Sequence, residues 1–175
     1  MSLHLPRLGH ALHQLLCARR TAALGTLVAG SGAPSVSMVP FAVDPAGDGA
    51  PAIVLHLSGL AAHTAHLQAD PRASLLITAP ETPGAPVHEL PRITLDALAS
   101  TPPPDTPAHH SAHAAYVQRF PEAAFMTALG DFRFVTLRVT GARQIAGFGS
   151  ARSVGADELA QVLALGTPAP TADAA

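Results

Sequence analysis

The order of hydrophobic and polar positions along this chain predicts one amphipathic helix followed by a series of strands. Leucines recur every three or four residues near the start, which is the spacing of a helix with one apolar face and predicts a helix over residues 6–19. From residue 21 onward, short apolar runs alternate with turns rich in Gly, Pro and Asp, as in antiparallel meanders. The predicted strands are residues 21–29, 35–43, 51–57, 73–79, 91–98, 131–139 and 143–148.

Short helices are expected between and after these strands. One is predicted over residues 60–68, with Ser58 as its N-cap and the Asp70-Pro71 dipeptide as its end. Further helices are predicted over residues 112–119, 121–129 and 156–165. Many strands with few helices indicate the α+β class, in the form of an antiparallel barrel with short flanking helices.

The length of 175 residues fits one domain with a sizeable core. Apolar residues make up 48% of the chain and charged residues only 13%, which supports a packed globular fold. We expect an N-terminal helix over residues 1–20 and a barrel domain over residues 21–165. A disordered tail is expected over residues 166–175, where Pro and Ala dominate.

Charge and cysteine usage argue against several classes of function. The net charge is −2, and every basic side chain is arginine with no run longer than Arg19-Arg20, so nucleic-acid binding lacks its electrostatic basis. Cys17 stands alone, which rules out an intrachain disulfide and a zinc site built on cysteines. The apolar stretches are too short for a membrane span and no signal-like segment develops, so we expect a cytoplasmic protein.

The motifs of the commonest enzyme classes are missing from the sequence, among them the nucleophile elbow, the phosphate-binding loop and the HExxH zinc motif. One candidate site is the junction of a strand and a helix that carries Ser58, His63 and Thr64. Amides at a helix N-terminus favour a phosphate group, and these three side chains add donors. The alternative is an ordinary serine-capped helix with exposed polar residues.

Histidines and one arginine provide two further candidates. His63 and His66 have a spacing that permits chelation, and more histidines cluster in residues 109–113, but no carboxylate or cysteine cluster accompanies them. Solvated histidines without a metal are therefore expected. Arg92 projects with Thr94 from a predicted strand, where a guanidinium can pair with a phosphate or a flavin carbonyl. The alternative for Arg92 is a surface ion pair at the barrel rim.

The order of the segments resembles that of a known family. In succession the chain contains AALGTL, SMVPF, LHLSGLAAHTAHLQADPRASLLI, LPRITLDALA, GDFRFVTLRV and IAGFGSAR. This order is similar to that of the FMN-binding split barrels related to pyridoxamine 5′-phosphate oxidase, and most similar to the branch that includes haem-utilisation proteins of the HugZ type. The resemblance extends from about residue 19 to residue 165, and the third segment is its most specific part.

The resemblance implies a six-stranded split barrel that works as a homodimer, with two FMN sites between the subunits. The cofactor-binding positions that it implies are Ser37, Met38, Val39, His56, Leu57, Ser58, His63, Thr64, Arg92 and Thr94. Ser37 stands where the oxidases of the family carry an arginine, so oxidation of pyridoxamine phosphate itself is not expected. No residue is assigned as a catalytic acid or base.

The function implied by the resemblance is that of an FMN-dependent oxidoreductase acting on a small molecule, with the hydride chemistry supplied by the flavin. The first alternative is a haem-binding or haem-degrading protein on the same fold. The second alternative is a non-catalytic binding or regulatory module that has lost its cofactor.

Overall fold

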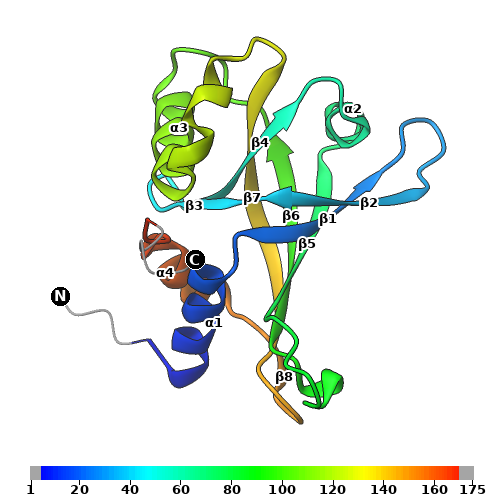
Figure 1. Ribbon diagram of the computed structural model, residues 1–175, viewed down its shortest axis with the longest axis vertical. Helices are drawn as coiled ribbons and strands as arrows, with labels where there is room; N and C mark the ends of the chain where they lie inside the picture. The colour runs from blue at the N-terminus through cyan, green and yellow to red at the C-terminus, as the bar shows by residue number, and fades with distance from the viewer. Residues whose placement is uncertain (1–4, 170–175) are drawn as a thin grey trace.

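Strands dominate the computed structural model, which describes residues 5–169 (Figure 1). The strands are β1 (Thr21–Leu27), β2 (Pro34–Pro40), β3 (Ala42–Asp44), β4 (Ala52–Ser58), β5 (Arg72–Thr78), β6 (Arg92–Ser100), β7 (Phe132–Ile145) and β8 (Ala151–Ser153). The helices are α1 (Arg7–Ala18), α2 (Ala62–Ala69), α3 (Pro107–Arg119) and α4 (Ala156–Ala164), with the 3-10 helices η1 (Val87–Glu89) and η2 (Pro121–Ala128). None of the helices within residues 5–169 has the length and apolar character needed to cross a membrane.

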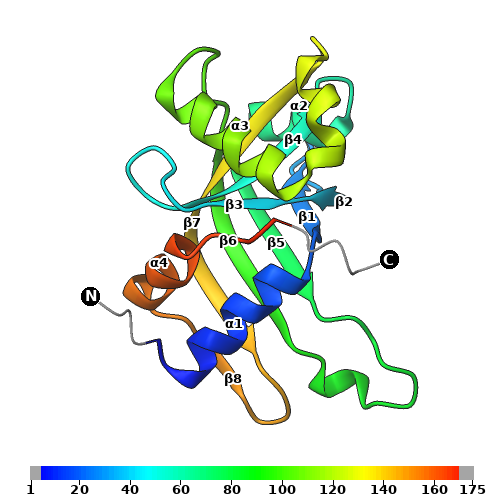
Figure 2. The same cartoon turned by 60° about the vertical axis from the view of Figure 1, so that its left-hand side comes forward.

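The strands form one antiparallel sheet whose order is β2-β1-β5-β6-β7-β4-β3, with β8 paired to β7. Residues along β1 alternate between buried and half-buried positions, as expected for a strand with one face on a core. The sheet curls into a half-barrel, which both ribbon views show (Figures 1 and 2). The α+β class and the split barrel are thereby confirmed, but the sheet has eight strands where the resemblance implied six.

The predicted strand 35–43 divides into two strands that lie at opposite ends of the sheet. Pro40 ends β2, and the backbone N–H of Phe41 donates to the carbonyl oxygen of Arg20 at 3.1 Å before the chain continues as β3. A proline has no N–H to donate to a ladder, which favours a break at this position. Because β2 pairs with β1 and β3 pairs with β4, the connection through Phe41 joins the two ends of the sheet and requires it to curl.

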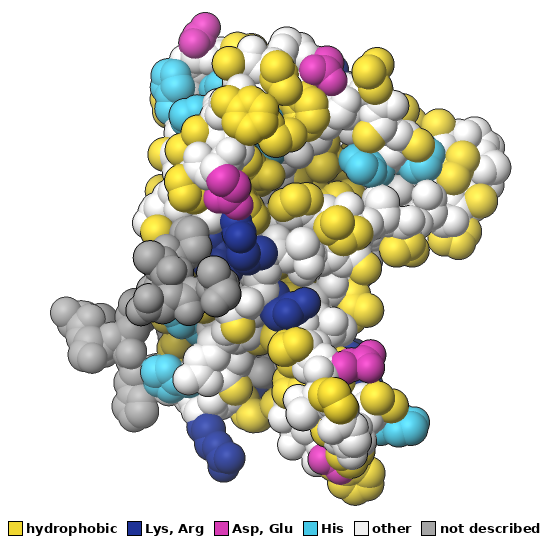
Figure 3. Space-filling view, in the orientation of Figure 1, with side chains coloured by type: hydrophobic (Ala, Val, Ile, Leu, Met, Phe, Trp, Pro, Cys, Tyr) yellow, Lys and Arg dark blue, Asp and Glu magenta, His cyan; other side chains and the backbone are white. Residues whose placement is uncertain are grey.

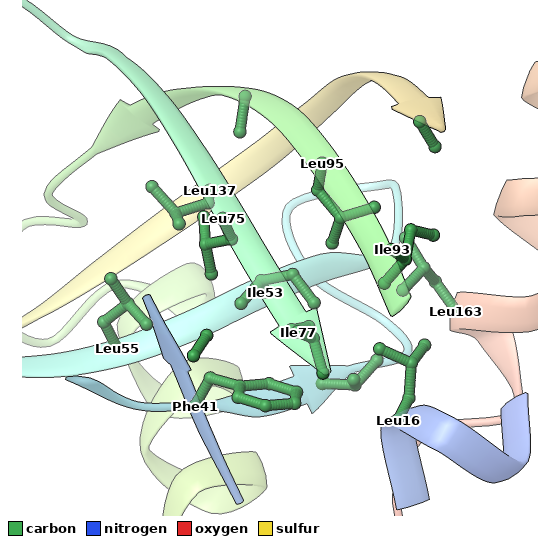
Figure 4. Close-up of a cluster of buried hydrophobic side chains, with 14 of the residues drawn as sticks. Leu16, Phe41, Ile53, Leu55, Leu75, Ile77, Ile93, Leu95, Leu137 and Leu163 are labelled. Carbon is green, nitrogen blue, oxygen red and sulfur yellow. The ribbon is translucent and has the colours of Figure 1, made fainter. Parts of the chain in front are cut away.

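Apolar side chains on the concave face of the sheet form the main core (Figure 4). Phe41 is fully buried there, with Ile53 of β4 and Leu75 of β5 in the same cluster. α1 and α4 pack against each other and close this core through Leu16 and Leu163. The first helix predicted from the leucine spacing is therefore a covering element of the barrel.

α3 covers the other face of β4 and β7 and forms a second, smaller core. Val54 and Phe134 point away from the main core because side chains alternate along a strand. They pack against Tyr116 and Phe120 at the α3 end of the molecule. Part of the sheet is thus buried on both faces.

The helix boundaries differ from the predicted ones in three places. α2 begins at Ala62 with Ala61 as its N-cap, so Ser58 lies outside the helix that it was expected to cap. α3 begins at Pro107, earlier than predicted, because Thr106 caps it and accepts a hydrogen bond from the His109 N–H at 3.3 Å. The stretch predicted as a helix over 121–129 is the 3-10 helix η2.

The segment predicted as a disordered tail begins with packed residues. Gly166 and Thr167 are buried, and the carbonyl oxygen of Pro168 accepts a hydrogen bond from Arg119 Nη1 at 2.9 Å. Residues 170–175 of the predicted tail lie outside the described residues. The first part of the segment therefore belongs to the folded domain.

Candidate functional site

The turn between β4 and α2 is fixed by hydrogen bonds of Ser58. Its hydroxyl donates to Asp131 Oδ2 at 2.9 Å and accepts from the Leu60 N–H at 3.2 Å. Its carbonyl oxygen accepts from Thr64 Oγ1 at 2.7 Å, and Thr64 is buried. The polar groups of Ser58 are therefore engaged within the turn, where the sequence suggested donors for a phosphate.

Two histidines of α2 bind hydroxyl groups of the neighbouring strands. His63 Nδ1 lies 3.0 Å from Ser37 Oγ on β2, and His66 Nδ1 lies 3.0 Å from Thr26 Oγ1 on β1. Histidine side chains are visible at the surface where α2 lies beside β2 (Figure 3). Burial, followed by the nearby His66, lowers the pKa of His63 below its ordinary value, which favours its neutral form. The predicted pair Ser37 and His63 is thus brought into contact.

Two charged residues beside α2 were not singled out from the sequence. Asp131 precedes β7 and accepts the Ser58 hydroxyl, while Arg133 lies on β7 opposite Leu57. Gly59 leaves room for the Arg133 side chain, because a Cβ at position 59 would lie 2.6 Å from Arg133 Nη2. An anion at the start of α2 would therefore meet an attractive guanidinium and a repulsive carboxylate. The alternation in the DFRFVTLRV segment placed both residues on one predicted strand, but gave no sign of their position at α2.

His56 lies in a cluster of aromatic rings under α3. Its ring centroid is 4.6 Å from that of Phe134, 5.1 Å from that of Phe132 and 5.4 Å from that of Tyr116. The side chain is only 6% exposed. Burial, together with the charge of His113, lowers the pKa of His56 to about 4. His56 is therefore a neutral packing residue of the second core.

Other sequence-predicted positions lie in the main core or at the rim of the sheet. Val39 and Leu57 are buried, so a cofactor would reach them only through their backbone. Arg92 is half-buried, and its Nη1 donates to the carbonyl oxygens of Leu90 at 2.9 Å and His88 at 3.5 Å. Among residues 5–169, Arg92 has no ion-pair partner, so the surface ion pair that was the alternative for it does not form.

Part of the outer face of the sheet carries apolar side chains without a covering helix. Met38, Ala23, Leu76 and Thr94 form a row of paired positions across β2, β1, β5 and β6. Met38 is 69% exposed and Val36, the next outward residue on β2, is 72% exposed. We call the surface made by these five residues the bare sheet face. Monomeric proteins seldom leave a continuous apolar surface of this kind open to water.

A cleft of 670 Å³ lies where distant parts of the chain meet beside α3. It is bounded by the 47–52 loop, the end of β6, the start of α3 and the middle of β7. Its lining residues are Gly47, Asp48, Ala50, Pro51, Ala52, Pro71, Leu98, Ala99, Ser100, Thr101, Pro102, Pro103, Thr106, Pro107, Ala108, Thr136 and Arg138. Prolines, alanines and one leucine give this lining an apolar character, and Arg138 and Asp48 are its charged members.

A smaller hollow of 270 Å³ shares part of the cleft lining, including Pro71 and Ser100. Thr64 borders this hollow and is the one sequence-predicted site residue that borders either space. The cleft could not be inferred from local patterns, because its walls come from segments separated by up to about 90 residues. Among the described residues, no group of three His, Cys, Asp or Glu side chains is placed to hold a metal ion.

Comparison with known families and proteins gives consistent matches. The family model described as CREG, beta-barrel matches residues 13–161. The protein named heme oxygenase HutZ from Vibrio cholerae is 30% identical over 142 residues, which cover 81% of this chain and 77% of that protein. The structure of HutZ, described as a heme storage protein, has a TM-score of 0.68 and 27% identity, covering 78% of this chain and 94% of that one.

Two other solved structures extend the comparison. A heme binding protein from Mycobacterium smegmatis has a TM-score of 0.75 and 29% identity over 91% of this chain. The match spans only 62% of that protein's own length. A putative pyridoxamine 5′-phosphate oxidase from Listeria innocua has a TM-score of 0.53 and 13% identity, covering 81% of this chain and all of that one, which shows a shared fold alone.

Proposed function

We propose that this chain, which belongs to the CREG β-barrel family, binds haem in the cleft beside α3. The observation that carries the proposal is the cleft itself, an apolar space of 670 Å³ within the range of small-molecule sites. The names of relatives at 27–30% identity, which describe haem binding, storage or oxygenation, support the same ligand. Haem was the first alternative to FMN that the sequence allowed, and it now becomes the preferred ligand.

The residues of the cleft fit haem in shape and charge. Proline and alanine walls suit the faces of a flat apolar macrocycle, and Arg138 offers a cation for its carboxylates. The lining contains no His, Met, Cys or Tyr, so the iron ligand has to come from beyond it. His110, which is exposed on α3 one turn after the lining residue Pro107, is the candidate in this chain. Bound haem would supply iron for ligand binding or oxygen chemistry, and the protein would supply the apolar enclosure.

Titration of the purified protein with haemin tests this function. We expect a sharpened and shifted Soret band that saturates at one haem per chain, with dissociation in the micromolar range or tighter, because an apolar macrocycle leaves water on binding. FMN added under the same conditions should keep the fluorescence of the free flavin. Absence of any haem complex at micromolar protein would contradict the proposal.

FMN remains the second candidate, and the contact between Ser37 and His63 is the observation that favours it. Because one hydrogen of this pair is used between its two members, the pair offers a single neutral donor, and the Arg133 guanidinium beside Gly59 adds a cation near the start of α2, where a phosphate could approach. The carboxylate of Asp131 works against an anion there. Quenching of flavin fluorescence in the titration, without a haem complex, would favour FMN and an oxidoreductase, and the absence of both would favour a module without cofactor.

We also propose that the protein is a homodimer that buries the bare sheet face. Val36, Met38 and Leu76 are exposed at 72%, 69% and 39%, and burying them against a second copy would remove a continuous apolar surface from water. The same face carries Arg143 and Asp96, whose opposite charges could pair across a two-fold axis. A hollow of 350 Å³ between Met38, Ala23 and Leu76 could accept a side chain of the second copy.

Replacing Met38 with Asp is expected to convert this dimer to monomer at micromolar concentration. A buried carboxylate without a partner is strongly unfavourable in an apolar interface. We therefore expect the dissociation constant of the dimer to rise at least about 100-fold. Sedimentation velocity or light scattering gives the mass directly. Phe125→Asp, at a residue of η2 that is 71% exposed outside this face, is the matched control and should keep the dimer. A wild-type protein that is already monomeric would contradict the homodimer.

A further inference from the structure

We propose that Arg138 selects ligands with a carboxylate, so that the cleft takes flat apolar molecules that carry an acid group at one edge. The proposal deepens the haem-binding function and rests on it. Arg138 lies on β7 opposite Leu98 of β6, and both residues line the cleft. A cation thus stands directly beside the apolar wall.

The guanidinium of Arg138 is free to accept an anion. Within residues 5–169 it takes part in no ion pair, and the other charged member of the lining is Asp48 of the 47–52 loop. Asp96 of the neighbouring strand β6 lies outside the cleft lining and accepts a hydrogen bond from Ser74 Oγ at 3.4 Å. An acid group in the cleft would therefore be attracted to β7 and repelled from the loop, which fixes the direction in which a ligand enters.

Three hydroxyl groups around the cleft are engaged within the protein. Ser100 Oγ and Thr136 Oγ1 lie 2.8 Å apart and bind each other. Thr106 Oγ1 donates to the Pro103 carbonyl oxygen at 2.7 Å and accepts from the His109 N–H at 3.3 Å, so it caps α3 from within. Since these hydroxyls are already paired, Arg138 is the strongest donor that the cleft offers to a carboxylate.

Arginine suits this task because its planar guanidinium forms two parallel hydrogen bonds to one carboxylate. Such charge-assisted bonds are stronger than neutral ones, although exposure to water reduces their contribution at a surface. We therefore expect Arg138 to account for about a tenfold to hundredfold difference in affinity between an acid and its ester. A macrocycle with two carboxylates belongs to this class of ligand, and so does any ring-opened form that keeps them.

The test compares haemin with its dimethyl ester, both in the same mild detergent, on the wild type and on Arg138→Met. Methionine keeps an apolar stem and removes the charge and both donors. We expect the variant to bind haemin about tenfold to hundredfold more weakly and the ester as well as the wild type does. Arg7→Met is the matched control, since Arg7 is an exposed arginine of α1 outside the cleft and outside the bare sheet face, and it should leave both affinities unchanged.

Each outcome separates this inference from the proposed function. Haem binding by the wild type, with equal affinity in Arg138→Met, would overturn the role of Arg138 and leave haem binding intact. If Arg138→Met lost the same affinity for haemin and for its ester, Arg138 would shape the cleft without binding the carboxylate, and the inference would be overturned. A wild type that binds neither molecule would overturn the proposed function and this inference with it. Melting temperatures within 1–2 °C of each other would confirm that the variants are folded.

Discussion

Replacing Arg119 with Met is expected to destabilise the folded protein by about 3–5 kcal/mol. Arg119, at the end of α3, is only 4% exposed. Its Nη2 donates to the carbonyl oxygens of Cys17 at 2.6 Å and Arg19 at 3.0 Å, and its Nη1 donates to that of Pro168 at 2.9 Å. Methionine would leave these three carbonyls without a donor in a place that water reaches poorly.

The guanidinium of Arg119 joins three parts of the chain. The carbonyls of Cys17 and Arg19 flank the C-terminus of α1, where a cation is favoured by the helix dipole, and Pro168 follows α4. Burial lowers the pKa of Arg119 below its ordinary value, so holding the charge has a cost that the three hydrogen bonds must offset. We call these three hydrogen bonds of Arg119 the Arg119 clamp, and they hold the start of the predicted tail against the folded domain.

Urea denaturation at 25 °C would measure the effect as a difference in the free energy of unfolding. Arg119→Lys keeps a positive charge but loses the planar guanidinium that reaches three carbonyl oxygens. Its free energy of unfolding should lie between those of the wild type and Arg119→Met. Arg7→Met removes an exposed arginine outside the proposed dimer interface and should stay within about 0.5 kcal/mol of the wild type. If Arg119→Met lowered the free energy of unfolding by less than about 1 kcal/mol, the stabilising role of the Arg119 hydrogen bonds would be contradicted.

The strands and the first helix could be predicted from the sequence because periodicity is a local signal. The leucines of α1 and the alternation of β7 report burial through the residues themselves. The break at Phe41 depends instead on which strands pair. Pro40 predicted only an edge or a bulge at this place. The sequence pattern predicted seven strands and the resemblance implied six. The structure has eight, because the predicted strand 35–43 divides into β2 and β3, the predicted strands 131–139 and 143–148 form the single strand β7, and β8 is only three residues long.

The start of α3 was predicted too late because residues 99–110, with four prolines and two histidines, have the composition of an irregular connection. Thr106 followed by Pro107 is a helix-start pattern, with a capping hydroxyl and a proline in the first turn. Weighing that pair against the composition of residues 99–110 would have predicted the observed boundary. The boundary matters for the cleft, because the first turn of α3 lines it.

The candidate site was only partly accessible from the sequence. The contact between Ser37 and His63 joins residues that the resemblance to a family had already grouped, although periodicity alone gave no reason to pair them. His56 was expected beside a cofactor, and the structure places it among aromatic rings. Arg138 was missed because it is one of several arginines on alternating strand positions, and only the tertiary fold sets it beside Leu98.

Asp44 holds the loop that forms one wall of the cleft. The residue is 2% exposed, and its Oδ1 accepts from the N–H groups of Ala46 and Gly47, both at 3.0 Å, and from Ser111 Oγ at 2.9 Å. Gly47 has a φ of 48°, and a Cβ there would lie 1.9 Å from the carbonyl oxygen of Ala50. The loop is therefore tightly folded, and the Asp44 carboxylate joins it to α3.

Replacing Asp44 with Ala is expected to destabilise the protein by about 3–4 kcal/mol, because three donors lose a charged acceptor in a buried place. Asp44→Asn keeps an oxygen for the same donors, but places an amide where the buried Oδ2 has no partner among the described residues, so we expect a loss of about 1–2 kcal/mol. Asp48→Ala, at an exposed position of the same loop, is the control and should change the stability by no more than about 0.5 kcal/mol. Urea denaturation gives the three values, and faster amide exchange at Ala46 and Gly47 in Asp44→Ala would place the loss in the loop. If Asp44→Ala and Asp48→Ala were equally stable, the carboxylate of Asp44 would not be what holds this wall of the cleft.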